Sequence, residues 1–381
     1  MDFGLTEKQE QDRQRIVEFA RRELNHDVVG RDAAQEFPRE AWRRCADMGI
    51  QGMAVPEAFG GTEADPVTIT VTLESLGYGC EDNGLLFALN AQMWSCQIPI
   101  VRFGSELLKQ RYLPGLCDGS LIGGHAMSEP DSGSDAFSLT TTARRDGDGY
   151  VLRGSKAFVT NAPVADVFVV FATTAPGTGF AGVTAFVVER GTPGLIVGPP
   201  IAKMGLRTAP MGELLLADCR VRSEQVLGRA GSGIGVFTCA MDWERSFILA
   251  CVVGTMQRQV ERCVRYAKQR RQFGQPIGSF QSVSNQIVDM KLRLETSRLL
   301  LYHLAWLRST GQPTAMESAL AKLHLSESFL ENSLAAVQIH GGHGYVSETG
   351  IERDVRDAIA ARIYSGTSEI QRSLVARQFG L

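Results

Sequence analysis

The sequence lacks the features that mark several classes of protein. Its eight cysteines are scattered and no two form a CxxC pair, so neither a disulfide framework nor a zinc site is expected. The longest apolar run in the C-terminal half, residues 299–307, is interrupted by Tyr302 and His303 and is too short to cross a bilayer. The N-terminal segment, residues 1–23, is polar and has no apolar leader. We therefore expect a cytoplasmic protein with reduced thiols and no membrane partner.

A strong charge of either sign is also absent. The chain has 39 Lys and Arg residues against 42 Asp and Glu residues, a formal net charge of -3, so no global field favours nucleic acid as a partner. Hydrophobic residues make up 44% and charged residues 21%, which is typical of a globular protein. A chain of 381 residues is long enough for two or three domains with a large buried core.

The texture of the sequence changes twice along the chain. Residues 5–120 carry apolar side chains at helical spacing. From about residue 123 to 230, short runs rich in Val, Phe and Thr alternate with Gly, Pro and Asp, which predicts an antiparallel sandwich or barrel. Long amphipathic segments then predict a four-helix bundle. The predicted domains are an N-terminal helical domain (1–122), a middle β domain (123–232) and a C-terminal helical bundle (233–381).

Three patterns of glycine, histidine or serine carry no chemistry by themselves. Gly231-x-Gly233-x-Gly235 lies outside any alternation of strand and helix, so a hinge between domains is favoured over a dinucleotide fingerprint. His340 and His343 are separated by two glycines that break helical geometry, and no third ligand lies nearby in sequence, so no metal is expected. No G-x-S-x-G segment supports a hydrolase of that type.

Two segments could hold a flat, charged ligand. HAMSEPDSGSD (125–135) gathers hydroxyls, Gly and acceptors where helices give way to strands, and such a loop suits a polar heterocycle or a phosphate, although an ordinary turn is equally open. In GSKAFVTNAP (154–163), the strand period of two puts Phe158 and Thr160 on the same side. That pair could flank a flat ring.

A third segment, MDWERSFILA (241–250), puts Glu244 beside Arg245 at an apolar helix. Charges are costly there unless they have a partner or a chemical role. The residues alone leave two interpretations open, a catalytic site and an ion pair at the helix surface.

Together these segments resemble the acyl-CoA dehydrogenase family. The motifs that carry the resemblance span nearly the whole chain and are AMSEPDSGSD, KAFVTN, KMGLR, QFGQPIGSFQ, QIHGGHGY and YSGTSEIQR. The resemblance implies the same α–β–α order, FAD bound at a subunit interface, and a homotetramer or homodimer. It also implies oxidation of an acyl thioester of CoA or a carrier protein, with a flavoprotein or oxygen as electron acceptor.

The resemblance implies cofactor contacts residue by residue. Those expected around the flavin and nearby phosphates are Met127, Ser128, Ser134, Phe158 and Thr160, with Phe158 standing where the family usually has Trp. Those expected from a neighbouring subunit, at the pyrophosphate and adenosine, are Arg270, Phe273, Gln281, Gln338, Gly341 and Gly342. Thr367 and Glu369 would hold the near end of the same cofactor. Surface capping is the alternative for Arg270 and Gln338.

Position 365 departs from the family pattern. Most members carry a catalytic Glu between the Tyr and Gly of this motif, but the chain has Ser365, whose hydroxyl is no useful base at neutral pH. In isovaleryl-CoA and some long-chain dehydrogenases the base stands at the position matched by Glu244, which is the expected base here. The Ser365 N–H is expected to bind the thioester carbonyl oxygen. The expected substrate contacts are Ser134, Asp242, Arg245 and Ser365.

Several segments resemble biosynthetic members that act on prolyl-carrier proteins. They are LGYGCEDNGLLFA (76–88), MDWERSFILA, RRQFGQPIG, MKLRLETSRLLLY (290–302) and YSGTS. A prolyl thioester is therefore the leading substrate. Two alternatives are a flavin monooxygenase of the same fold and a thioester-binding homologue that has lost catalysis.

Overall fold

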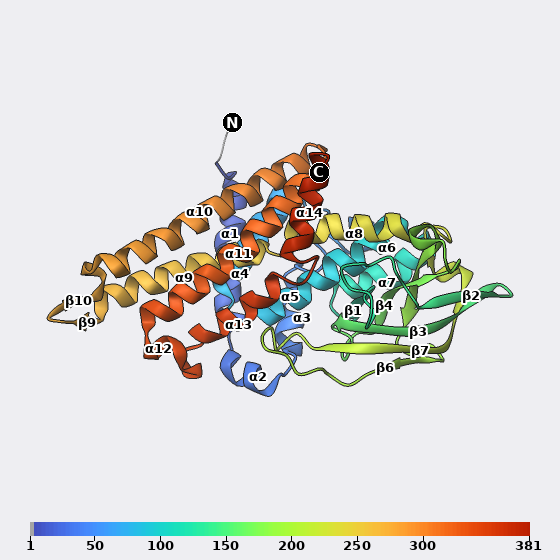
Figure 1. Cartoon of the computed structure of the whole chain (residues 1–381), viewed down its shortest axis with the longest axis horizontal. Coiled ribbons are helices and arrows are strands. Elements are labelled where there is room, and N and C mark those ends of the chain that lie inside the picture. Colours follow the sequence, from blue (N-terminus) through green and yellow to red (C-terminus); the bar gives the residue numbers. More distant parts are fainter. Residues whose placement is uncertain (1–3) are drawn as a thin grey trace.

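The structure is a computed structural model that describes residues 4–381, so the first three residues of the polar N-terminal segment lie outside it. The chain is elongated, with a long helical bundle at one end and a β domain at the other (Figure 1). The predicted order of helices, strands and helices is confirmed. No helix within the described range combines the length and the apolarity needed to span a membrane.

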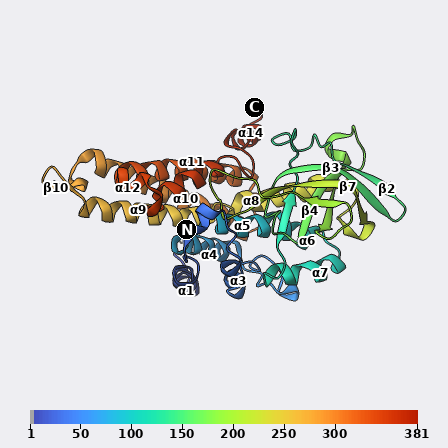
Figure 2. The ribbon, with the colours of Figure 1, turned by 90° about the horizontal axis from the view of Figure 1, so that it is seen from below.

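The N-terminal helices lie along one side of the molecule (Figure 2). α1 begins at a capping box, in which Thr6 and Gln9 satisfy each other's backbone amides, and it buries Ile16 and Phe19. Asp82 caps α5 by accepting from the Leu85 amide. The elements of this part are α1 Glu7–Glu23, α2 Val28–Ala34, α3 Arg39–Asp47, η1 Glu57–Phe59, α4 Pro66–Gly79, α5 Asn83–Gln92, the π-helical turn η2 Met93–Gln97, α6 Ile98–Phe103 and α7 Glu106–Cys117.

The middle part is an eight-stranded sheet with the order β6-β7-β3-β2-β4-β5-β8, and β1 pairs with β4. Its neighbours are antiparallel except for β1–β4 and a single residue pair between β2 and β4, so the sheet is mixed. The strands are β1 Gly123–Ala126, β2 Thr142–Asp146, β3 Gly149–Thr160, β4 Val167–Thr173, β5 Val183–Glu189, β6 Leu195–Val197, β7 Met211–Arg222 and β8 Val226–Leu227, with 3₁₀ turns η3 Gly179–Gly182 and η4 Ser223–Gln225. β4 is buried along its whole length.

The C-terminal part is a bundle of long helices. α9, α10 and α11 run side by side, and a short hairpin of β9 and β10 forms the tip farthest from the sheet (Figures 1 and 2). The elements are α8 Gly233–Phe247, α9 Ala250–Gln269, β9 Arg271–Gln272, β10 Gln275–Pro276, η5 Ile277–Ser279, α10 Gln281–Ser309, α11 Ala315–His340, α12 Gly342–Tyr345, η6 Ser347–Thr349, α13 Ile351–Ala361 and α14 Ser368–Gln378.

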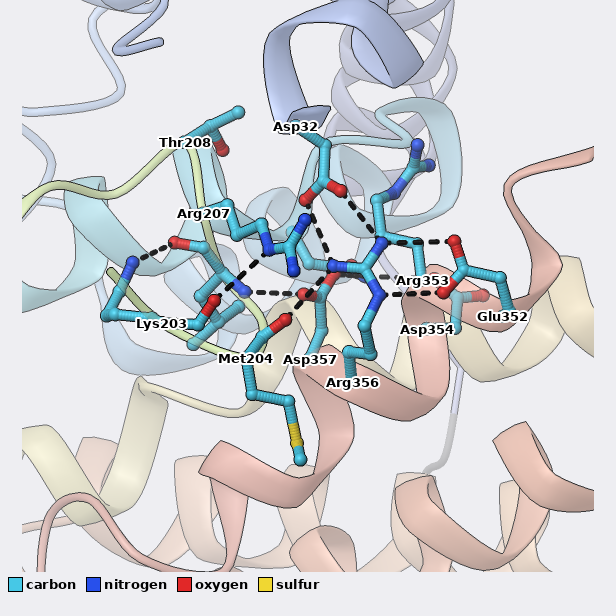
Figure 3. Close-up of polar contacts among 12 residues, drawn as sticks. Asp32, Lys203, Met204, Arg207, Thr208, Glu352, Arg353, Asp354, Arg356 and Asp357 are labelled. Atoms are coloured by element: carbon cyan, nitrogen blue, oxygen red, sulfur yellow. Dashed lines mark hydrogen bonds and ion pairs between the residues drawn. The ribbon is translucent and has the colours of Figure 1, made fainter. Parts of the chain in front are cut away.

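A buried polar junction joins the three parts beside α13 (Figure 3). Asp357 on α13 accepts from the Leu206 amide and from the Asn83 side chain. Arg356 pairs with Asp32 on α2, with 2.7 Å between Nη2 and Oδ2. A Cβ at Gly205 would lie 2.3 Å from the Arg356 carbonyl oxygen, so the KMGLR loop requires glycine for its close approach to α13. The junction holds α13 against α2 and the KMGLR loop.

Candidate active site

The side chain of Glu244 lies on the buried face of α8, with only 7% of the residue exposed. Its two carboxylate oxygens have different partners. The Ser365 hydroxyl donates to Oε1, and the Ser95 hydroxyl donates to Oε2. One carboxylate thus joins α8 to the π-helical turn η2 and to the loop between α13 and α14. Hydroxyl donors satisfy a buried charge that would otherwise be costly.

Ser95 stands in the π-helical turn η2, a rare geometry that is frequent at functional sites. Its carbonyl oxygen accepts from His125 Nδ1 at 2.9 Å, which assigns the ring proton to that nitrogen. Burial lowers the pKa of His125, while the charge of Glu244 acts in the opposite direction. The His125 ring centroid lies 5.2 Å from that of Phe171 and 6.2 Å from that of Phe237. His125 is therefore a neutral, packed support for Ser95.

Side chains of the bundle hold the loop that carries Ser365 by donating hydrogen bonds to its backbone carbonyls. Ser365 and Gly366 both have left-handed backbone, with φ of 58° and 88°. Arg245 Nε and Gln371 Nε2 donate to the Ser365 carbonyl at 3.3 and 3.1 Å. Lys322 Nζ and Gln371 Nε2 donate to the Gly366 carbonyl at 2.7 and 2.9 Å. Within residues 4–381, no acceptor bonds the Ser365 amide, which leaves this N–H available to a ligand.

Two further predicted substrate contacts, Asp242 on α8 and Ser134 in the β domain, make no hydrogen bond to Glu244 or Ser365 in the described part of the chain. Asp242 pairs with Arg308, with 2.6 Å between Oδ2 and Nη2, and the Arg308 guanidinium lies 4.9 Å from the Trp243 ring centroid. Ser134 is exposed on the loop after β1. The structure therefore gathers Glu244 and Ser365 at one point, while Asp242 faces Arg308.

The residues predicted to face the flavin lie on two adjacent segments of the β domain. Lys156 Nζ donates to the Met127 carbonyl at 3.1 Å, and the Ala157 amide donates to the Ser128 carbonyl at 2.9 Å. Lys156 also pairs with Glu129, with 2.8 Å between Nζ and Oε1, and both side chains are buried. Burial raises the pKa of Glu129, but Lys156 outweighs that effect and the pKa falls to about 2. This ion pair anchors Met127 and Ser128 to β3.

Phe158 is an exposed aromatic ring on an otherwise well-covered strand. It is 63% exposed and has a positive φ of 56°, at a register shift between β3 and β7. Ala157 and Val159 are buried, whereas Phe158 and Thr160 are not. The two predicted flavin contacts thus point away from the core on the same side of β3.

The second group of predicted cofactor contacts lies at the far end of the bundle. Arg270 precedes the β9–β10 hairpin, and Phe273 lies in its turn, where it is 92% exposed. Gln281 begins α10, and Gln338, Gly341 and Gly342 lie where α11 ends. Figure 1 shows this tip and β3 at opposite ends of the molecule. One copy of the chain therefore does not bring the two groups together.

Thr367 and Glu369 lie at the start of α14. Thr367 caps this helix by accepting from the Ile370 amide at 3.3 Å, and Glu369 is exposed on the first turn. Both follow the Ser365 loop directly, so they belong to the Glu244 end of the bundle and not to the β9–β10 tip.

Sequence reasoning missed Ser95, His125 and Lys322 as parts of this site. Ser95 reads as an ordinary helical position, because nothing in the sequence marks the π-helical turn. His125 begins the HAMSEPDSGSD segment, yet its contact with Ser95 depends on the packing of elements that are distant in sequence. A lysine inside the apolar pattern of α11 was the one available signal for Lys322, because buried lysines need a partner.

Three family models match consecutive parts of the chain. They are described as the N-terminal domain of acyl-CoA dehydrogenase at residues 6–120, its middle domain at 124–219 and its C-terminal domain at 231–380.

Similar whole proteins are also known. The chain is 42% identical to an L-prolyl-[peptidyl-carrier protein] dehydrogenase of Serratia sp. (strain ATCC 39006), over 100% of this chain and 99% of the relative. The crystal structure of the prolyl acyl carrier protein oxidase AnaB superposes with a TM-score of 0.98 at 47% identity, covering 99% of this chain and 100% of that one. The structure of PigA with FAD and proline superposes with a TM-score of 0.98 at 41% identity, covering 100% of both chains.

Proposed function

Because the chain belongs to the acyl-CoA dehydrogenase family, we propose that it uses FAD to oxidise the acyl group of a carrier-protein thioester. The observation that carries this proposal is the carboxylate of Glu244. It is buried, it accepts from the hydroxyls of Ser95 and Ser365, and it lies beside a Ser365 amide that has no acceptor among the described residues. A base and a carbonyl-binding N–H are the two groups needed to make a thioester α-carbon acidic.

In the proposed reaction, Glu244 removes the α-proton of the acyl group. The Ser365 amide donates to the thioester carbonyl oxygen and stabilises the negative charge that develops on it. FAD, when bound, supplies the acceptor for the hydride that leaves the β-carbon. The acyl group thereby loses two hydrogens and gains a double bond between its α- and β-carbons.

The hydroxyls of Ser95 and Ser365 hold the Glu244 side chain in one orientation before substrate arrives. Positioning of this kind lowers the entropic cost of reaching the reactive geometry. Ser365 thus contributes its hydroxyl to the base and its amide to the carbonyl, although its own side chain cannot replace the base.

The exposed residues of the two predicted groups fit a long cofactor. Phe158 presents an uncovered ring beside Thr160, and the Met127–Ser128 segment next to it is fixed by Lys156. The β9–β10 tip and the end of α11 present exposed polar groups and two glycines whose Cβ positions open onto empty space. We propose that FAD joins the first group of one copy to the second group of another, in a homodimer or homotetramer.

The preferred substrate follows from the similar proteins. A relative 42% identical is named for L-prolyl-carrier protein, and the similar PigA structure contains FAD and proline. We therefore propose a prolyl group as the acyl substrate. AnaB is named an oxidase and the Serratia relative a dehydrogenase, so both oxygen and a flavoprotein are candidate electron acceptors.

The test is anaerobic mixing of the FAD-loaded protein with a panel of thioesters. We expect bleaching of the flavin absorbance with prolyl-carrier protein and slower or no bleaching with short-chain acyl-CoA. Bleaching by no thioester would favour a homologue that binds without catalysis. If the pre-reduced protein instead formed a flavin hydroperoxide and hydroxylated a substrate, the monooxygenase alternative would replace this proposal.

A further inference from the structure

Lys322 is a lysine on α11 with none of its surface exposed. Its Nζ donates to the Gly366 carbonyl oxygen at 2.7 Å and lies 5.9 Å from the centroid of the Tyr364 ring. A buried ammonium is expensive in an apolar setting. Its position next to the Ser365 loop therefore needs a reason.

Stability alone does not explain this lysine. The Gly366 carbonyl also accepts from Gln371 Nε2 at 2.9 Å, so the carbonyl would keep a partner without Lys322. Replacement of a buried charge by an apolar side chain of similar volume is often neutral or stabilising.

The geometry around Gly366 indicates that Lys322 helps to orient the backbone of the Ser365 loop. With both carbonyls of the Ser365–Gly366 segment bonded to side chains of the bundle, the Ser365 amide is left to face elsewhere. Gly366 has a φ of 88°, and a Cβ there would lie 2.7 Å from Gln371 Nε2, so the loop is pressed against this side of the bundle. The Lys322 bond is the shortest of the four that hold these carbonyls.

We propose that Lys322 is a positioning residue whose bond to the Gly366 carbonyl orients the Ser365 amide toward the carbonyl oxygen of the thioester. This inference rests on the proposed function, because it assigns the Ser365 amide to the thioester. Lys322 does not touch the reacting atoms. It acts through the peptide plane between Gly366 and Thr367, because fixing this plane restricts the backbone of the Ser365 loop.

The charges around Lys322 provide a pH-dependent readout. Burial, together with the charge of Arg245 on α8, lowers the pKa of Lys322 to about 8, although Glu244, Glu327 and Glu369 act in the opposite direction. These groups belong to α8, α11 and α14, and Tyr364 lies on the loop. A neutral amine is a weaker donor than an ammonium. The bond to Gly366 is therefore strongest below about pH 8.

The first test is binding of two unreactive carrier-protein analogues to the FAD-loaded protein. One analogue has an amide in place of the thioester and keeps the carbonyl oxygen, and the other has a thioether and lacks it. For Lys322→Met we expect affinity for the amide analogue to fall roughly tenfold, with affinity for the thioether analogue unchanged. Equal effects on both analogues, or no effect on either, would overturn the proposal.

Lys203→Met is the matched control. Lys203 also donates to two backbone carbonyls, those of Leu206 and Ala209 at 2.8 and 2.9 Å, and burial likewise lowers its pKa to about 8. It belongs to the junction beside α13 and not to the Ser365 loop (Figure 3). We expect this variant to bind both analogues like the wild type. Selective loss of the amide analogue in Lys203→Met as well would show a general effect of a lost lysine and contradict the proposal.

The second test is the pH dependence of flavin reduction by substrate. We expect the wild-type rate to decline above about pH 8, and Lys322→Arg, which keeps its charge, to show no such decline. If Lys322→Met does not fold, Lys322→Arg decides alone, and an unchanged decline in that variant refutes the inference. The binding test separates this inference from the proposed function, because carbonyl recognition is measurable even in a protein that reduces no flavin.

Discussion

The Ser365 hydroxyl donates a hydrogen bond to Oε1 of Glu244. These are the two positions at which the family is expected to carry its base, one on the loop before α14 and the other on α8. Their direct contact means that a carboxylate at either position reaches the same point in the site. The serine at position 365 is therefore compatible with the base that we propose on α8, and it does not by itself mark a lost activity.

Replacement of Glu244 by Gln should remove the proposed base while keeping a side chain of the same size. We expect substrate-driven flavin reduction to fall by about 10²- to 10⁴-fold. FAD should stay bound, because the hydrogen-bond partners of the Glu244 carboxylate among residues 4–381 are Ser95 and Ser365, and neither is a predicted cofactor contact. Rapid-mixing absorbance measures the rate, and the flavin spectrum measures occupancy. Glu331→Gln, at an exposed pair with Arg293, is the control and should reduce at the wild-type rate. Equal rates for Glu244→Gln and the wild type would exclude Glu244 as the base.

The two hydroxyls that hold Glu244 should matter less than the carboxylate. Ser365→Ala keeps the backbone N–H, and Ser95→Ala keeps the carbonyl that bonds His125. Loss of one hydrogen bond to a charged group is worth about 1.5–3 kcal/mol, so each variant should slow flavin reduction by roughly 10- to 150-fold. Because both hydroxyls bind one carboxylate, their effects should not add. A double variant whose loss equals the product of the single losses would argue against a shared role.

The sequence was sufficient for the fold class and for naming Glu244 as the candidate base, because motifs such as DWER and YSGTS occupy fixed places along the chain. It could not give the contact of Ser95 with Glu244, since that contact depends on a π-helical turn and on the packing of elements 149 residues apart. The sequence could not place Lys322 in the site for the same reason. A helical pattern shows that a lysine faces the core. It does not show that the lysine donates to the Gly366 carbonyl, on the loop between α13 and α14.

The junction of the three domains should make stability depend on pH. Burial raises the pKa of Asp357 from its ordinary value of 3.8 to about 7, although Leu206, Asn83 and Arg353 act in the opposite direction. Between about pH 4 and pH 7 the folded protein therefore binds a proton that the unfolded chain has lost. Its stabilising contribution is complete below about pH 4 and is lost as the pH rises through about 7.

Asp357→Asn tests this linkage, because the amide cannot titrate. We expect the Tm of the FAD-saturated wild type to fall more steeply between about pH 4 and pH 7 than that of the variant. The difference in the free energy of unfolding over this range should be at most about 4 kcal/mol. The variant can be less stable at every pH, since its amide must face the Asn83 side chain. Only the difference in slope bears on the prediction, and parallel pH profiles would contradict it.

The separation of the two predicted cofactor groups leads to a complementation experiment. Phe158 lies on β3 and Arg270 at the opposite tip of the molecule (Figure 1). If FAD joins two copies, then Phe158→Ala and Arg270→Ala oligomers should each bind FAD weakly at every site. A mixed oligomer places both defects in one site and leaves another site intact. Co-expression with two different affinity tags, followed by tandem purification, isolates this mixed form.

We expect the mixed oligomer to recover tight FAD binding at its intact sites, measured by flavin content and by titration of the apoprotein. If a single copy held the whole cofactor, every site in the mixture would carry one defect and no recovery would occur. A monomeric wild-type protein in light scattering would also refute the two-copy arrangement. The control is a mixture of Phe158→Ala with a second, differently tagged Phe158→Ala, which should stay as weak as its parents because each of its sites has the same defect.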